Sequence, residues 1–284
     1  MALATGVVDS SSETRSIFFW RVGMPILRVQ DTQLYYETIG QGEPLLFIHG
    51  LGSSTRDWER QVAFFCRRYQ VIAFDVRGHG QSDKPPGPYS VQLFTADAAA
   101  LIKSLGLDRV HVVGISMGGM IAFQLAIDAP NLVKSLVIVN SGPEFVTRTF
   151  KERLGILQRL LVVRLLGMGK MGEVLGKRLF PRPEQKHLRR VLIERWAEND
   201  KRAYLASFRA IVGWSVVAHL GEIGCPVLVV AADQDYTPVS FKEAYAAKLP
   251  HAELAIISDS RHLSPIDRPE EFNEALLAFL SKQG

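Results

Sequence analysis

Short apolar runs alternate with longer stretches of helical periodicity from residue 26 to the end of the chain. Eight of the apolar runs have the composition of strands, and they lie at residues 27–29, 33–39, 45–49, 71–75, 110–115, 135–140, 227–232 and 253–257. Four of them, which read Leu-Leu-Phe-Ile, Val-Ile-Ala-Phe, Val-His-Val-Val and Val-Leu-Val-Val, lack polar alternation, as is typical of central strands buried on both faces. The first two runs are expected to form an antiparallel hairpin at the edge of the sheet.

Helical patterns separate these runs, at residues 95–105, 119–127, 241–248 and 269–281. Strands that alternate with helices in this way predict an α/β fold, in which helices cover both faces of a mostly parallel sheet.

One interval departs from this alternation. Between residues 140 and 227 the chain shows several helical patterns, including 151–166 and 189–212, and no convincing strand. Because no compact α/β unit needs a connection of more than 80 residues, we expect residues 142–224 to form an inserted helical subdomain on a core of residues 24–141 and 225–284. Residues 1–23 lack ordered periodicity and are predicted to be a disordered extension.

The segment Gly114-Ile115-Ser116-Met117-Gly118-Gly119 lies where an apolar strand pattern changes into a helical one. A serine at the tip of such a tight turn is forced toward unfavourable backbone angles, and glycines at 114 and 118 let the turn close without a clash. The Ser116 hydroxyl would then point outward, beside backbone N–H groups at a helix N-terminus that can face an anion. We therefore expect Ser116 to be a nucleophile.

A serine hydroxyl is a weak nucleophile at neutral pH, so it needs a base that is itself oriented by an acid. His262 follows the last predicted strand, at the edge where open α/β sheets place their sites. Asp233 and Asp235 follow the strand at 227–232, and their positions alone leave open which of the two is the acid.

Two further motifs follow strands at the same edge. His49-Gly50-Leu51-Gly52 has glycines that would let the Leu51 N–H approach a developing oxyanion together with the N–H of Met117. The segment from Asp75 to Ser82 is interpreted as structural, with Asp75 and Arg77 bracing loops by hydrogen bonds.

Taken in order, these motifs resemble those of the α/β-hydrolase family, and the resemblance extends from about residue 24 to residue 280. It implies an α/β-hydrolase fold of about eight strands, with residues 142–224 as a cap. It also implies Ser116 as nucleophile, Asp235 as acid and His262 as base, in the family's chain order. The sequence departs from the family pattern at Ala232 and Arg261, where glycine is common.

The resemblance further implies ester or lactone hydrolysis without a metal or an organic cofactor. Relatives that act on carbon–halogen bonds or epoxides carry aspartate at the position of Ser116, and C–C bond hydrolases usually carry Gly-Pro-Gly where this chain has Gly50-Leu51-Gly52. The substrate would be a small ester or lactone. The alternatives are a C–C bond hydrolase or cofactor-free haloperoxidase-like enzyme with the same triad, and a non-catalytic ligand-binding protein of the same fold.

The amino-acid composition excludes several classes of protein and kinds of site. Of the 284 residues, 47% are hydrophobic and 22% charged, which excludes a disordered or collagen-like chain. Cys66 and Cys225 belong to no cysteine or histidine cluster, so we expect no disulfide framework, no zinc site and a cytoplasmic location. No apolar stretch is long enough to span a bilayer, and a net charge of +4 is a poor nucleic-acid signature. The oligomeric state is left open.

The positive charge is concentrated in the predicted insert. Residues 142–224 hold 16 Lys and Arg against 8 Asp and Glu, a formal charge of +8, whereas the rest of the chain carries −4. A solvated helical face explains this simply, while a sharper hypothesis is attraction of a carboxylate-bearing substrate or of anionic lipid. Four leucines of the insert share one helix face and form a stripe, which is expected to line an acyl pocket or to pack onto the core: Leu154, Leu157, Leu161 and Leu165. The candidate substrate contacts are His49, Trp196, Phe208 and Trp214.

Overall fold

A computed structural model describes residues 25–284, and the extension predicted at residues 1–23 lies outside this range. An eight-stranded sheet runs through the described chain in the order β1-β2-β4-β3-β5-β6-β7-β8. The strands are β1 (Ile26–Val29), β2 (Thr32–Ile39), β3 (Glu43–Ile48), β4 (Tyr69–Phe74), β5 (Val110–Ile115), β6 (Val133–Val139), β7 (Val227–Ala232) and β8 (Ala252–Ile257). All eight predicted strands are therefore confirmed, each within two residues at either end.

The pairing of these strands is mostly parallel, which confirms the predicted α/β class. Only the β1–β2 and β2–β4 pairs are antiparallel, and the predicted hairpin is β1–β2. Every residue of β5 and β7 is buried, because helices cover both faces of the sheet at these strands.

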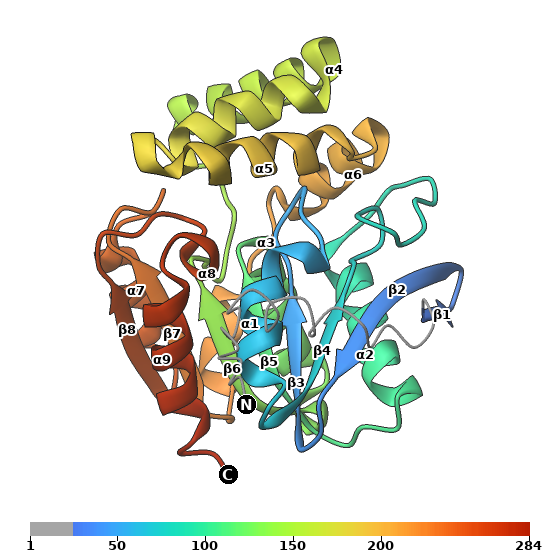
Figure 1. The fold of residues 1–284 in the computed structure, drawn as a ribbon, viewed down its shortest axis with the longest axis vertical. Coiled ribbons are helices and arrows are strands. Elements are labelled where there is room, and N and C mark those ends of the chain that lie inside the picture. The colour runs from blue at the N-terminus through green and yellow to red at the C-terminus, as the bar shows by residue number, and fades with distance from the viewer. Residues whose placement is uncertain (1–24) are drawn as a thin grey trace, which may run out of the picture.

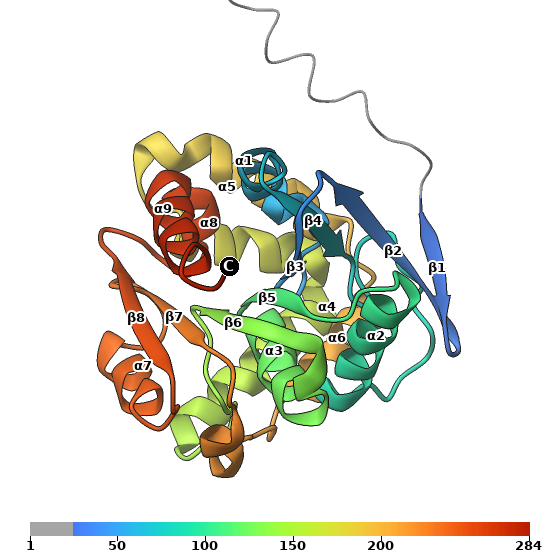
Figure 2. The ribbon, with the colours of Figure 1, turned by 90° about the horizontal axis from the view of Figure 1, so that it is seen from below.

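Helices form a layer on each face of the sheet (Figure 2). One layer contains α1 (Glu59–Phe65), α8 (Ser264–Asp267) and α9 (Pro269–Leu280), and the other contains α2 (Val91–Ser104), α3 (Met117–Asp128) and α7 (Val239–Ala246). Each face of the sheet has its own hydrophobic core, and successive residues of β3 point to opposite faces. Leu45 and Phe47 belong to the core on the side of α1 and α9, while Leu46 and Ile48 belong to the core on the other side. The four helical patterns predicted outside the insert correspond to α2, α3, α7 and α9.

Three α-helices lie between β6 and β7: α4 (Phe150–Leu179), α5 (Lys186–Ala197) and α6 (Lys201–Ile211). They cover one end of the sheet (Figure 1). We call residues 142–224 the cap and propose that they form a subdomain inserted into the core. The predicted helix at 189–212 is in fact two helices, because the chain turns at residues 198–200 and Asp200 caps the N-terminus of α6.

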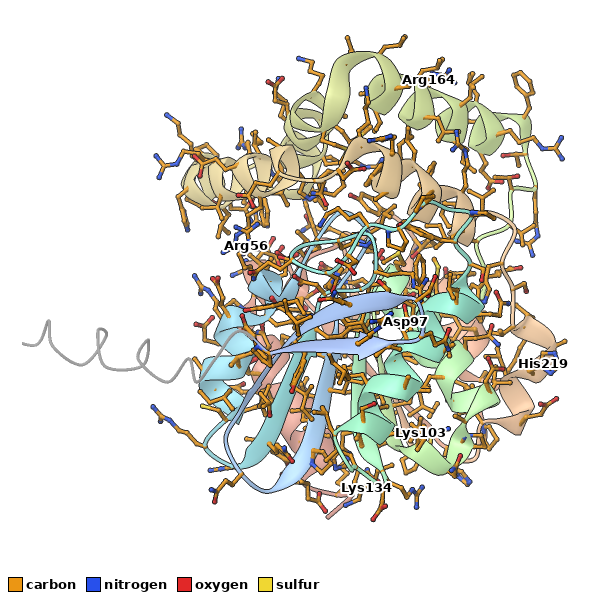
Figure 3. The ribbon with its side chains drawn as sticks, turned by 90° about the vertical axis from the view of Figure 1, so that its right-hand side faces the viewer. Arg56, Asp97, Lys103, Lys134, Arg164 and His219 are labelled. Atoms are coloured by element: carbon orange, nitrogen blue, oxygen red, sulfur yellow. The ribbon has the colours of Figure 1, made fainter. Side chains whose placement is uncertain are left out.

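Charged side chains join the cap to the core. Arg195 of α5 pairs with Asp57 at 3.5 Å and Glu59 at 3.0 Å, and Arg56 pairs with Glu198 at 2.5 Å (Figure 3). These pairs border a cavity of about 520 Å³ between α5 and the loops at residues 52–60 and 80–84. Within residues 25–284, no helix combines the length and apolar character needed to cross a membrane.

Candidate active site

The turn around Ser116 joins β5 to α3 and has the strained geometry expected for it. Ser116 has φ 55° and ψ −117°, which an L-residue rarely adopts. A Cβ at Gly114 would overlap the carbonyl oxygen of Gly118, and one at Gly118 would overlap the carbonyl oxygen of Ile48. The two glycines are therefore required for the turn to close against β3.

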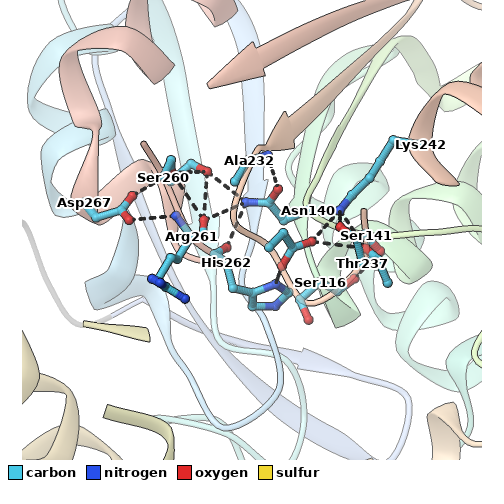
Figure 4. Close-up of polar contacts among 12 residues, drawn as sticks. Ser116, Asn140, Ser141, Ala232, Thr237, Lys242, Ser260, Arg261, His262 and Asp267 are labelled. Carbon is cyan, nitrogen blue, oxygen red and sulfur yellow. Dashed lines mark hydrogen bonds and ion pairs between the residues drawn. The ribbon is translucent and has the colours of Figure 1, made fainter. Parts of the chain in front are cut away.

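His262 and Asp235 form a short contact next to this turn (Figure 4). The Nδ1 atom of His262 lies 2.6 Å from Oδ1 of Asp235, whose side chain is only 1% exposed. The Tyr236 ring packs on the imidazole, with 4.5 Å between ring centroids. Within residues 25–284, Nε2 of His262 has no hydrogen-bond partner, so it is free to accept a proton from a nucleophile.

The second aspartate has a different role. The Asp233 carboxylate accepts hydrogen bonds from the backbone N–H groups of Asp259 at 2.9 Å and Ser260 at 3.1 Å. It holds the turn that precedes His262, whereas Asp235 contacts the imidazole itself. The geometry therefore favours Asp235 as the acid.

Asn140, at the end of β6, connects the candidate residues, and the sequence patterns gave no indication of this role. Its amide nitrogen donates to the carbonyl of His262 at 3.0 Å and its amide oxygen accepts from the N–H of Ala232 at 2.7 Å. The next residue, Ser141, donates from Oγ to the carbonyl of Ser116 at 2.7 Å. Two consecutive residues thus tie the Ser116 turn, the end of β7 and the His262 loop together (Figure 4).

Lys242 was also missed, although it is fully buried against Asp235. Its ammonium group lies 2.6 Å from Oδ2 of Asp235 and donates to the carbonyl and the hydroxyl of Thr237 at 2.7 and 2.6 Å. Burial alone would raise the pKa of Asp235, but the hydrogen bond and charge of His262, together with Lys242, lower it to about 2. The Asp235 carboxylate is therefore ionised over the whole physiological range.

Two backbone N–H groups, those of Leu51 and Met117, lie in the segments that meet at Ser116. A Cβ placed on Gly50 would lie 3.4 Å from Cβ of Ser116, so the loop after β3 runs directly against the turn. Within the described residues neither the Leu51 N–H nor the Met117 N–H donates a hydrogen bond. Met117 is also the first residue of α3, where the helix dipole favours negative charge.

His49 does not fit the expectation that it contacts the substrate. Its side chain is completely buried, Nε2 accepts the N–H of Val76 at 2.9 Å and Nδ1 bonds the carbonyl of Gly50 at 2.8 Å. Burial lowers its pKa to about 4, so it is neutral. His49 braces the loop after β3 from within the core.

The three aromatic candidates of the cap occupy different places. Trp196 lies over Gly52, where a Cβ would come within 2.9 Å of its ring, and Phe208 stacks with Tyr204 at 6.4 Å between centroids. Trp214 instead donates from Nε1 to Gln124 of α3 at 2.9 Å, which packs the end of the cap onto the core. Trp196 thus lies above the candidate oxyanion loop, and Trp214 has a packing role.

The predicted leucine stripe faces solvent, which corrects both expectations for it. Leu154, Leu157, Leu161 and Leu165 are 41–73% exposed, so they neither line a pocket nor pack onto the core. The reason is that α4 buries its other face, including Val163, against the rest of the molecule.

Asp75 and Arg77 brace loops, as predicted. The Asp75 carboxylate accepts the N–H groups of Thr55 and Gln81, both at 2.7 Å. Arg77 forms a buried, two-bond ion pair with Asp97 of α2, at 2.5 and 2.6 Å (Figure 3). These contacts fix the loop that follows β4.

A second cavity, of about 110 Å³, borders Asp235 and His262. It is lined by Arg178, Leu179, Gln234, Asp235, Tyr236, Arg261 and His262. Ser116 lines neither cavity, and only the smaller one is lined by Asp235 and His262, so we associate the smaller one with these two residues.

Comparisons with known proteins agree with this geometry. Residues 45–275 match the alpha/beta hydrolase family. The chain is 29% identical over 262 residues to 3-oxoadipate enol-lactonase 2 of Acinetobacter baylyi, a match that covers 90% of this chain and 96% of that protein. It is 31% identical over 256 residues to the (E)-2-((N-methylformamido)methylene)succinate hydrolase of the same organism, covering 88% and 94%.

Among solved structures, the enol-lactonase from Burkholderia xenovorans LB400 has a TM-score of 0.84 at 23% identity, covering 90% of this chain and all of that one. At this identity the likeness concerns the fold. With the family match over most of its length, this chain belongs to the alpha/beta hydrolase family.

Proposed function

We propose that this chain hydrolyses a carboxylic ester or lactone through an acyl-enzyme, with Ser116 as nucleophile, His262 as base and Asp235 as acid. The observation that carries the proposal is the 2.6 Å contact between His262 Nδ1 and the buried Asp235 carboxylate, at the loop that Asn140 holds beside the Ser116 turn. The name of the related 3-oxoadipate enol-lactonase 2 supports the same chemistry.

In the first half of the reaction, Nε2 of His262 takes the proton of the Ser116 hydroxyl while Oγ bonds to the substrate carbonyl carbon. The negative charge moves to the carbonyl oxygen, where the N–H groups of Leu51 and Met117 stabilise it. Collapse of this intermediate breaks the bond to the alcohol oxygen, which receives the proton from His262. In a lactone the released hydroxyl stays attached to the acyl chain.

In the second half, His262 removes a proton from water as the water oxygen attacks the acyl carbon. The Ser116 oxygen then leaves and recovers a proton from His262, which frees the acid product. Asp235 holds the imidazole in the tautomer that has Nε2 free, and it stabilises the charged ring in both halves.

Turnover of p-nitrophenyl butyrate by the full chain tests the proposal. We expect Ser116→Ala to lower kcat by a factor of about 10⁴ or more, because the attacking atom is removed. Ser104→Ala, which changes an exposed serine at the end of α2, is the matched control and should keep the wild-type rate. Undiminished turnover by a folded Ser116→Ala variant would contradict the assignment. A parallel panel of lactones and dienoate-type substrates separates ester cleavage from C–C cleavage.

A further inference from the structure

Arg159 differs from the other positive residues of the cap in its surroundings. It is half-buried, yet within residues 25–284 no carboxylate lies within ion-pair distance of it. Arg189, which is also half-buried, is satisfied by the carbonyls of Phe180 and Arg182 at 2.9 and 3.1 Å. A half-buried guanidinium without an anion keeps its charge available to a negatively charged ligand.

Aromatic rings hold the Arg159 guanidinium in place. Its Nε donates to the Tyr204 hydroxyl at 2.7 Å, and its central carbon lies 4.9 Å from the centre of the Phe208 ring. Within the described chain its two terminal nitrogens have no hydrogen-bond partner. These two nitrogens present parallel donors that match the two oxygens of a carboxylate.

The position of this guanidinium relates it to the candidate oxyanion loop. The Tyr204 ring that Arg159 contacts comes within 3.2 Å of a Cβ placed on Gly52. Gly52 follows Leu51, whose N–H we assign to the oxyanion. Arg159 therefore stands one tyrosine ring away from this loop, on the cap side.

A second arginine of α4, Arg178, lines the small cavity beside Asp235 and His262. The Arg178 guanidinium lies 4.3 Å from the centre of the Tyr236 ring, which itself packs on His262. Burial raises the pKa of Tyr236 to about 12, and the positive charges of Arg159 and Arg178 oppose this rise. Arg159 and Arg178 lie on opposite sides of a bend in α4 at Gly167, where φ is 82°.

We infer that Arg159, with Arg178 at the rim, binds a carboxylate of the substrate, so that the preferred substrates are esters or lactones whose acyl part carries a second, free carboxylate. The inference rests on the proposed function and names the substrate class of that same site. It gives two of the positively charged side chains of the cap a role in substrate binding.

The test compares two esters of similar acyl length, p-nitrophenyl hydrogen glutarate and p-nitrophenyl pentanoate, with the full-length protein. The wild type should have the higher kcat/KM for the acidic ester. Arg159→Met keeps an unbranched apolar chain on Phe208 and should lower kcat/KM for the acidic ester by about 10- to 100-fold, the loss expected for charge-assisted hydrogen bonds. The neutral ester should be nearly unaffected. Arg178→Met should show a smaller loss in the same direction, since its side chain is exposed.

Arg164→Met is the matched control, because it removes the same charge from an exposed position of α4 at the top of the cap (Figure 3). It should leave the selectivity unchanged. Three results would overturn the inference: no wild-type preference for the acidic ester, equal losses for both esters in Arg159→Met, or an equal loss of selectivity in Arg164→Met. The second would show that Arg159 only supports Tyr204, and the third that the cap attracts anions without a site.

A measurement on the wild type alone covers the case in which Arg159→Met does not fold. Glutarate should compete with the neutral ester, whereas 1,5-pentanediol, which has the same carbon chain without carboxylates, should not. Absence of competition by glutarate would also overturn the inference. Failure of the proposed function is distinguishable, because it would appear as turnover of the neutral ester that Ser116→Ala leaves intact.

Discussion

At the carboxyl edge of the sheet, the side chains of Asp235 and Asn140 are buried and held by short contacts, whereas α4 of the cap exposes apolar and charged side chains alike. Asp235 has partners on both carboxylate oxygens, and Asn140 bonds to two loops. On α4, by contrast, Leu165 is 73% exposed and Arg159 has no acidic partner within the described chain.

This difference in burial corresponds to two proposed tasks, proton transfer at the sheet edge and substrate selection by α4. Groups that move protons need one fixed geometry, which buried and hydrogen-bonded neighbours such as Asp235 and Asn140 provide. Groups that select a substrate need free donors and accessible surface. We therefore expect changes at the sheet edge to affect every substrate, and changes in α4 to affect some substrates or none.

The largest expected effect within this comparison comes from the acid. Asp235→Asn should lower kcat by about 10⁴ for all esters, because the amide cannot hold His262 in the required tautomer or stabilise its charged form. Asp233→Asn should leave kcat close to the wild-type value and cost about 1 kcal/mol of folding free energy, as it weakens two backbone hydrogen bonds. Steady-state kinetics and urea unfolding of both variants measure this. The reverse ranking of the two aspartates in kcat would assign the acid to Asp233.

A smaller effect, on the free energy of unfolding, is expected when the pH is lowered. The pKa of Asp235 is about 2 in the folded protein, against an ordinary value of 3.8. Because the folded value is the lower one, the unfolded chain takes up the proton first as the pH falls. The stabilisation is thus complete above about pH 4 and is lost as the pH falls through 2, an amount of about 2 kcal/mol. Urea unfolding between pH 5 and pH 2 should show this loss in the wild type and a weaker one in Asp235→Asn; equal losses would contradict it.

The smallest effect is expected on the outer face of α4. Leu157→Ala, at a position 51% exposed, should change the free energy of unfolding by less than about 0.5 kcal/mol. Leu101→Ala, at a fully buried position of α2, should cost about 2–5 kcal/mol, since it leaves a cavity. Urea unfolding of the two variants compares the regions directly. A large loss in Leu157→Ala would mean that this face is covered, for example by a second copy of the chain.

Local signals explain what the sequence predicted well. Apolar runs without polar alternation indicated the four central strands, and the glycines around Ser116 mark a turn that only residues without a Cβ permit. Lys242 could not be found in this way, because a lysine between Phe241 and Glu243 resembles any helix-surface residue. Its burial depends on how α7 packs beside the loop that carries Asp235.

The same limit applies to the cap. The periodicity of its leucines was visible in the sequence, but periodicity shows only that residues share a helix face and not which side that face is on. The turn between α5 and α6 was missed because residues 198–200 interrupt the helical pattern for less than one turn.

The most direct test of the account is whether Ser116 reacts as an activated nucleophile. A fluorophosphonate probe should add once to the full-length protein, and peptide mass spectrometry should locate the adduct on Ser116. His262→Gln should remove the reaction and Ser104→Ala should not. No adduct on Ser116 in the folded wild-type protein, or labelling that persists in His262→Gln, would contradict the assignment of the nucleophile and its base.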